Sequence, residues 1–294
     1  KESKKNISDF VRLYRLLWNG KLFILFFTLS FAIFSVLFSL SLTVTFKSES
    51  TLNIEDTNAL NVPQISGLNA LSQIGLLAPQ ADKSFEAIEM ITSRDFLKHL
   101  ISFKGIMPGI MAVSEYKKDK KIINYDDSKY DSSKETWIDG MQPTYLETYE
   151  EYSEIVSATI NSSGFLLIKV EHLSPYFAHD LLTLIIDETN NLAREKEIRR
   201  ANATLEYLKR EISNNTLSPL NLSLSRLIEV QYNRLVAAKL NKDYLLVPLE
   251  KPFIPERKSS PNRPLICILG TLLGGILSVF WIILRDFLKR EDLL

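Results

Sequence analysis

The 294-residue sequence has a single cysteine, Cys267, and only three histidines. One cysteine can form no disulfide within the chain and cannot build a thiolate zinc site. His99, His172 and His179 do not fit the HExxH spacing of a zinc protease. We therefore expect a fold held by packing alone, with no metal and no cofactor.

A phosphate-binding loop is missing as well. The GxxxxGK[S/T] pattern lets backbone amides wrap the phosphates of a nucleotide. The only Gly-Lys pair is Gly20-Lys21, and Arg15 stands where the first glycine of that pattern would be. A sequence does not show whether two carboxylates converge in a cleft. For this reason alone, an envelope enzyme that acts on sugars remains an alternative function. We expect that the chain is not an enzyme.

An excess of charge of one sign is also absent, because 35 basic residues stand against 35 acidic ones. Residues 115–139 contain four aromatic side chains, Tyr116, Tyr125, Tyr130 and Trp137, among charges of both signs. A nucleic-acid footprint requires a basic patch. We therefore expect no nucleic-acid partner and interpret 115–139 as a solvated excursion, with a sugar platform as the weaker alternative.

Two long apolar runs are present, at residues 22–46 and 265–284. At 1.5 Å per residue, each is long enough to cross a hydrocarbon core of roughly 30 Å. We expect transmembrane helices over 22–46 and 264–285. A cleaved signal peptide is the alternative for the first run, but its apolar core would be much shorter.

The orientation follows from the charges beside these runs. The tail 1–21 is rich in Lys and Arg, and the positive-inside rule counts such short flanks. We therefore expect both the tail 1–21 and the tail 286–294 to be cytoplasmic, with residues 47–263 on the other side of the membrane. Arg257 and Lys258, beside the second run, go against this rule.

The intervening residues 47–263 are enough for one folded domain. Two β-branched runs, 154–160 and 165–171, flank a turn-forming Asn-Ser-Ser-Gly and predict a β-hairpin. Shorter expected elements are a strand over 49–56, helices over 82–101 interrupted near Ser93, a loop over 58–80, a strand over 244–249 and, before the first span, a surface helix over 7–18.

A long helix is the main expectation for the domain. Ser174-Pro175 is a helix start signal, and no glycine or further proline occurs up to Asn214. This pattern predicts one helix over 175–214, and Ser218-Pro219 begins a second helix that returns to about Asp243. The predicted fold class is a membrane protein with two transmembrane helices flanking a periplasmic α+β domain with a long extended helix.

Three candidate contact surfaces follow from these elements. In the second apolar run, Gly270, Gly274 and Ser278 recur every four residues, which allows another helix to approach closely. Simple filler is an equal alternative, because glycine is common in such helices. We interpret the three residues as a face for transmembrane packing or for contact with a polymerase.

The long helix carries the second surface. Ile198, Ala201, Leu205, Leu208 and Ile212 step by three and four residues, the spacing of a heptad seam. A helix this long and polar must pack against another helix or another subunit. We expect an oligomer or function face whose members are Arg194, Arg199, Arg200, Leu205 and Leu208.

The third surface is a collar of prolines before the second span, Pro252, Pro255, Pro261 and Pro264. Proline fixes φ and donates no backbone hydrogen bond. Four of them predict a stiff, non-helical segment that transmits the orientation of the domain to the second span.

Six segments together resemble the Wzz chain-length determinant proteins, which are polysaccharide co-polymerases of Gram-negative inner membranes. The segments are LYRLLWNGK (13–21), SRDFL (93–97), EHLSP (171–175), NLAREKEIRRANATLEYLKREI (191–212), SPNRP (260–264) and GTLLGG (270–275). The resemblance implies a homo-oligomeric ring without catalytic residues. It also implies regulation of O-antigen chain length together with a Wzy-type polymerase, with lipid-linked polysaccharide as a further candidate partner.

Two other functions stay open. A relative that regulates the length of enterobacterial common antigen would have the same sequence features. A two-span sensory receptor would also have a large domain between two spans, but it needs a cytoplasmic output, and only ten residues follow Leu284.

Overall fold

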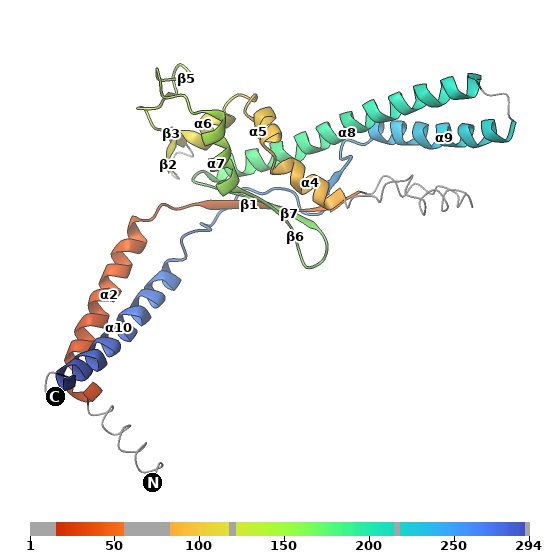
Figure 1. Cartoon of the computed structure of the whole chain (residues 1–294). Coiled ribbons are helices and arrows are strands. Elements are labelled where there is room, and N and C mark those ends of the chain that lie inside the picture. Colours follow the sequence, from red (N-terminus) through yellow and green to blue (C-terminus); the bar gives the residue numbers. More distant parts are fainter. Residues whose placement is uncertain (1–15, 56–82, 118–121, 215–217, 292–294) are drawn as a thin grey trace, which may run out of the picture. The chain divides into compact units, whose positions relative to one another are not determined.

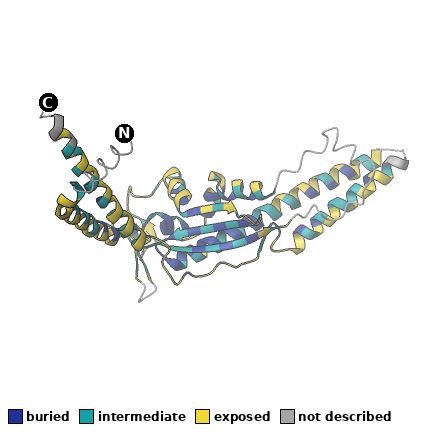
Figure 2. Ribbon diagram, turned by 90° about the horizontal axis from the view of Figure 1, so that it is seen from below, coloured by how far each residue is buried: buried dark blue, intermediate teal, exposed yellow. Residues whose placement is uncertain are grey.

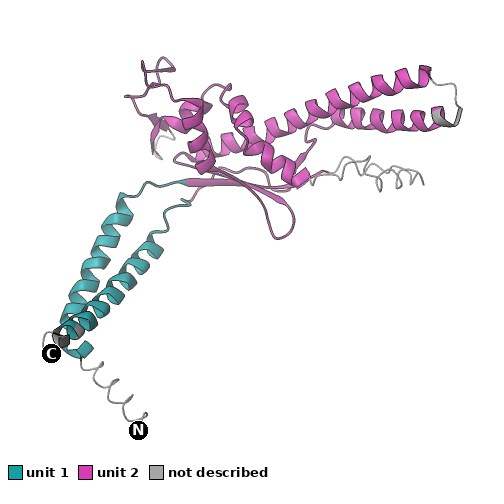
Figure 3. Cartoon of the chain, viewed as in Figure 1, with its two compact units in different colours: residues 1–45, 258–294 teal, residues 46–257 magenta. Residues whose placement is uncertain are grey.

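The computed structural model describes residues 16–55, 83–117, 122–214 and 218–291. The chain divides into two compact units, residues 1–45 with 258–294, and residues 46–257 (Figure 3). The first unit contains two helices that are long and apolar enough to cross a membrane, Lys21–Ser41 and Arg263–Asp286. The second is an α+β domain with a 40-residue helix. Two candidate membrane helices that flank an α+β domain with a long helix are the architecture that the sequence predicted.

The first unit is an antiparallel pair of helices, α2 (Lys21–Ser41) and α10 (Arg263–Glu291). The prediction of a helix as far as Phe46 was wrong at its end, because α2 stops at Ser41. The residues that follow, Thr43-Val-Thr45, are β-branched and favour extended backbone. Phe46 is already the first residue of a strand. Helix α10 in turn extends six residues past Arg285.

The domain is built on a four-stranded antiparallel sheet in the order β6-β7-β1-β8 (Figure 1). Its strands are β1 (Phe46–Ile54), β6 (Val156–Ile160), β7 (Leu166–His172) and β8 (Leu246–Pro248). The predicted hairpin is β6-β7. Its turn has Gly164 at a φ of 84°, which is the left-handed region that favours glycine. Strand β8 pairs with β1, so the end of the domain rejoins the sheet beside its first strand.

One face of this sheet is covered by the first half of α8 (Pro175–Asn214), whose bounds match the prediction. Alternate residues of β7 point toward the helix, and Leu166, Ile168 and Val170 are fully buried. Figure 2 shows this buried layer in dark blue. Because each buried aliphatic side chain contributes about 1.5–3 kcal/mol, this layer is the main core of the domain.

The second half of α8 pairs with α9 (Ser218–Leu240), and together they form an arm (Figure 1). Three buried side chains, Ala201, Leu205 and Leu235, make a small core between the two helices. The predicted antiparallel pair is therefore confirmed.

Shorter helices complete the domain: α4 (Lys83–Ile91), α5 (Arg94–Leu100), α6 (Ile106–Met111) and α7 (Tyr145–Ile155). The predicted break near Ser93 is confirmed, because the Ser93 hydroxyl accepts the Phe96 N–H at 3.1 Å and caps α5. Helix α7 occupies Glu154 and Ile155, so β6 begins two residues later than the β-branched pattern predicts.

The prediction of a solvated excursion over 115–139 was wrong in that parts of this region form strands. This region contains two small sheets, β2 (Val113–Lys117) with β3 (Ile122–Tyr125) and β4 (Tyr130–Asp131) with β5 (Thr136–Trp137). Tyr130 is 7% exposed and contacts the rings of Tyr125 and Trp137. Aromatic pairs of this kind add stability beyond burial, and they order a segment with few aliphatic residues. The predicted loop over 58–80, and residues 7–15 of the predicted surface helix, lie outside the described residues.

Candidate functional site

The contact between α2 and α10 is made where α10 has glycines. A Cβ built on Gly270 would lie 2.4 Å from the Cβ of Ser35, and one built on Gly274 would lie 2.5 Å from the Cβ of Phe31. Both distances are shorter than side chains allow. The backbones can therefore approach this closely only because neither position has a side chain.

Serines fill the rest of this face. Ser278 of α10 and Ser35 and Ser39 of α2 are at most 6% exposed. The hydroxyl of Ser278 donates to Gly275 O at 2.7 Å, and that of Ser35 donates to Ala32 O at 2.9 Å. Each of these two hydroxyls is thus satisfied within its own helix, as buried polar groups must be.

Of the small-residue face predicted at Gly270, Gly274 and Ser278, the glycines pack against another helix, which is one of the two roles predicted for that face. The first two residues contact the chain's own first helix, so they are not available to a neighbouring protomer or a polymerase. The repeat predicted close packing correctly. It could not identify the partner, because α2 lies more than two hundred residues away along the sequence.

Another side of α10 has an open, apolar groove. It is lined by Thr271, Leu272, Gly275, Ile276, Val279, Phe280 and Ile283. Gly275 differs from its neighbour Gly274, because a Cβ there would meet only the Thr28 Cγ2 at 3.4 Å, an ordinary contact. In a membrane this groove would face lipid or another helix.

The predicted collar of prolines is non-helical over residues 249–262. Pro255 and Pro261 are buried, and Pro252 is half-buried. Pro264 does not belong to the collar, because it is the second residue of α10. Proline is tolerated in the first turn of a helix, where backbone N–H groups have no partner within the helix.

The long-helix face is divided by the structure. Leu205 and Leu208 are each only 6% exposed and lie within the arm. They therefore do not form part of an exposed oligomer face, contrary to the prediction. The heptad seam is used within the chain, because α9 of the same chain covers it.

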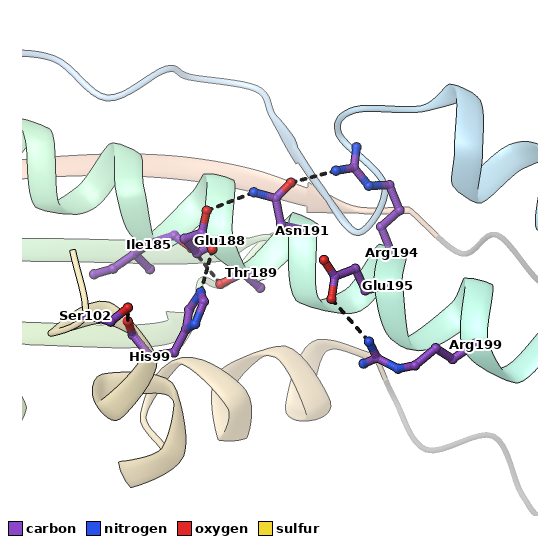
Figure 4. Close-up of polar contacts among 9 residues, drawn as sticks. All are labelled: His99, Ser102, Ile185, Glu188, Thr189, Asn191, Arg194, Glu195 and Arg199. Atoms are coloured by element: carbon purple, nitrogen blue, oxygen red, sulfur yellow. Dashed lines mark hydrogen bonds and ion pairs between the residues drawn. The ribbon is translucent and has the colours of Figure 1, made fainter.

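The arginines of that face lie outside this seam. Arg194 Nη2 donates to Asn191 Oδ1 at 2.8 Å, and Asn191 Nδ2 donates to Glu188 Oε1 at 2.8 Å (Figure 4). Arg199 pairs with Glu195 one turn earlier at 3.2 Å, and Arg200 is exposed. The structure thus keeps Arg199 and Arg200 at the surface and ties Arg194 into a polar chain along α8.

This polar chain continues to another helix. Glu188 Oε2 lies 2.6 Å from His99 Nε2, so it joins α8 to α5 (Figure 4). The same His99 ring contacts Phe103 edge to face. The contact holds the first half of α8 against the helices that precede it in the domain.

No pattern in the sequence indicates the role of Asn190. It is 2% exposed, and its side-chain Oδ1 accepts the N–H groups of Leu245 and Leu246 at 2.9 and 2.7 Å. Its Nδ2 donates to Leu246 O at 2.9 Å. The amide therefore bonds the returning chain as a neighbouring strand would, and it fixes the start of β8 against α8.

His172 is another buried polar residue of the domain, and burial changes its pKa. It is 6% exposed, and burial lowers the pKa of its imidazole to about 4. Its Nδ1 accepts the Ser174 N–H at 3.0 Å at the start of α8. The ring is therefore neutral at neutral pH, and its place is structural, as its position beside Phe177 indicates.

No group of three or more His, Cys, Asp or Glu side chains that could hold a metal ion occurs in the described part of the chain. The features with a clear geometry are instead surfaces for contact: the helix pair, the proline segment and the arm. Two candidate membrane helices around one α+β domain with a projecting helix pair define a two-span membrane protein with one large domain.

The family model of Wzz, described as chain length determinant protein, matches residues 7–103. This stretch includes α2, β1, α4 and α5. Two of the segments that carry the resemblance, 13–21 and 93–97, lie within the matched residues.

Two solved structures are similar to the chain. The first is described as a full-length bacterial polysaccharide co-polymerase; it is 16% identical and matches over 95% of this chain and 98% of that chain, with a TM-score of 0.36. The second is a fragment of WzzB, a polysaccharide co-polymerase from Salmonella Typhimurium, with 12% identity over 74% of this chain and 100% of that chain and a TM-score of 0.28. The comparison with curated proteins found no match.

Proposed function

We propose that this chain is a non-enzymatic regulator of O-antigen chain length that acts as a homo-oligomer together with a Wzy-type polymerase. The observation that carries the proposal is the match of the chain length determinant model to residues 7–103. The sequence lacks the motifs for nucleotide and metal chemistry, and this agrees with a role in regulation.

The proposed location is the bacterial inner membrane, with both termini in the cytoplasm and the α+β domain in the periplasm. Two helices of sufficient length and apolarity support the membrane location. The basic tail 1–21 supports the orientation.

Self-association in this proposal uses the outer surface of the arm. On α9, Tyr232, Val236 and Leu240 are 58%, 38% and 77% exposed and recur every four residues. Arg199 and Arg200 are exposed on α8. The apolar stripe on α9 and the exposed arginines on α8 are surfaces that a second copy could cover, whereas Leu205 and Leu208 are already buried within the chain.

The decisive experiment replaces the chain-length regulator of the host with this chain and reads the lipopolysaccharide ladder on a gel. We expect a cluster of bands around one preferred length, which is absent from cells with the empty vector. Common antigen is read from the same cells. A preferred length in that polymer alone would favour the common-antigen alternative, and an unclustered ladder in both would contradict the proposal.

A further inference from the structure

Strand β1 has two serines where a sheet normally places aliphatic residues. Ser48 and Ser50 alternate with Leu52 on the face that α8 covers, and both are 0% exposed. Their partners across the ladder are Val170 and Ile168. A buried hydroxyl is costly unless it forms a hydrogen bond, so two such residues in one strand require a structural reason.

Both hydroxyls donate to the chain segment that leads to α10. Ser48 Oγ donates to Phe253 O at 2.8 Å, and Ser50 Oγ donates to Glu250 O at 2.5 Å. Because the two serines share the face of Leu52, the segment must pass the edge of β1 on the face covered by α8. We call these two contacts the serine clamp.

The clamp lies where the ordinary ladder stops. The N–H groups of Leu249 and Glu250 both donate to Thr51 O, and the next backbone contacts of this segment join Ser259 and Ser260 to Thr45, just before β1. The next residue but one after Glu250 is Pro252, which has no N–H to donate. Side-chain donors on β1 therefore bind the carbonyls of a segment whose own backbone cannot continue the sheet.

We propose that Ser48 and Ser50 are positioning residues, which hold residues 249–253 against β1 and so determine where the lead-in to α10 leaves the domain. The prolines make this lead-in stiff, and the clamp fixes its origin. A stiff segment transmits orientation only if one end is held, so the two features act together. The link to polymer length rests on the proposed function, whereas the link to the segment does not.

The test removes both donors in the full-length chain, with Ser48→Ala and Ser50→Ala. Each lost bond should raise local opening about fivefold, so amide exchange at Leu249, Glu250 and Ser259 should be roughly 25-fold faster. The lipopolysaccharide ladder of complemented cells should shift to another preferred length, while oligomer size and membrane level stay unchanged.

Two matched variants separate positioning from general stability. Thr148 is also 0% exposed, and its hydroxyl donates to Thr144 O at 2.9 Å, away from the lead-in. Thr148→Ala should cost similar stability without changing exchange at 249–259 or the ladder. Ser157→Ala, at an exposed position of β6, should change neither measurement.

The outcomes decide the two claims separately. Unchanged exchange in the double variant would overturn the clamp, and faster exchange with an unshifted ladder would overturn its role in chain length, as would an equal shift with Thr148→Ala. If the unaltered chain itself gives no preferred length, the proposed function fails, and the exchange measurement still decides whether the serines hold the lead-in.

Discussion

The two helix pairs of this chain, α2 with α10 and α8 with α9, pack through different kinds of residue. Both pairs are antiparallel, and both have a repeat of three or four residues along the contact. In the apolar pair the contact residues are Gly270, Gly274 and three serines, and large apolar side chains such as Phe280 are exposed. In the arm the contact residues are Leu205, Leu208 and Leu235, and charged side chains face outward.

The difference shows that a periodic pattern of residues identifies the contact face of a helix only when it is known whether water or lipid surrounds that helix. In water, burial of leucine drives two helices together. In lipid that driving force is absent, so close backbone approach through small residues replaces it. Buried leucines therefore hold the two helices of the arm together, whereas most large apolar residues of the α2-α10 pair face outward.

The largest effect is expected from filling the close approach in the apolar pair. Gly270→Leu with Gly274→Leu should separate the helices, because overpacking costs about 1–3 kcal/mol at each site. The readout is the yield of a disulfide between Gly20→Cys and Ile282→Cys in a Cys267→Ser background, since a Cβ at residue 20 already touches Ile282.

Gly275→Ala is the matched control for that experiment. Its Cβ meets only Thr28 at 3.4 Å, so the disulfide yield should not change. An equal yield in the double leucine variant would show that the two helices are not held by their small residues.

The second effect concerns the arm, where the opposite change should do the damage. Leu205→Ala removes a 6% exposed side chain from a small core, and such truncations cost about 2–4 kcal/mol. Hydrogen exchange should accelerate over 198–214 and 226–240. Tyr207→Ala, at a residue that is 59% exposed on the same helix, should leave exchange nearly unchanged. If both variants exchange alike, the seam is not the core of the arm.

The third prediction is that the stability of the α+β domain depends on pH because of His172. His172 has a folded-state pKa of about 4 because of burial, below its usual value of 6.5. The stability that depends on its neutral form is complete above pH 6.5 and is lost as the pH falls toward 4. Between pH 7 and pH 5 the domain should therefore lose about 2 kcal/mol.

This loss can be followed by urea unfolding in a Trp18→Phe, Trp281→Phe background, in which Trp137 reports on the domain alone. His172→Gln should remove most of the difference between the two pH values. An unchanged pH dependence in the glutamine variant would assign the acid sensitivity to another group.

The smallest effect on stability is expected from the exposed arginines of α8. Arg199→Glu with Arg200→Glu should cost less than about 1 kcal/mol, since exposed ion pairs contribute little. If this surface takes part in chain-length control, the ladder should nevertheless shift. Lys239→Glu on α9 is the control. No shift with intact oligomers would remove these arginines from the proposed face.

Local signals predicted the fold well. The bounds of α8 follow from Ser174-Pro175 and from the absence of glycine and proline up to Asn214, and the break before α5 follows from Ser93. Such caps and breakers act on residues within one turn, so the sequence alone is sufficient to find them. The end of α2 was missed because the apolar run continues into β1, where the same residues serve a strand.

The partners of each surface could not be predicted in this way. Gly270 meets Ser35, Asn190 meets Leu246 and Ser48 meets Phe253, and each pair is separated by more than fifty residues. Spacing within one helix or strand shows which residues share a face, but the residue opposite depends on the whole topology. Spacing therefore identified the glycine face and the leucine seam as contact faces, but it did not show which helix lies opposite each of them.

The amide of Asn190 also separates the length of the arm from the architecture of the base. It fixes the returning chain to α8 at a single level, and farther along the arm the two helices pack against each other through Ala201, Leu205 and Leu235. Removing or adding one heptad in each of α8 and α9 would preserve the phase of that packing and leave β8 where it is. The length of the arm could therefore change by about 10 Å per heptad while the four-stranded sheet stays the same.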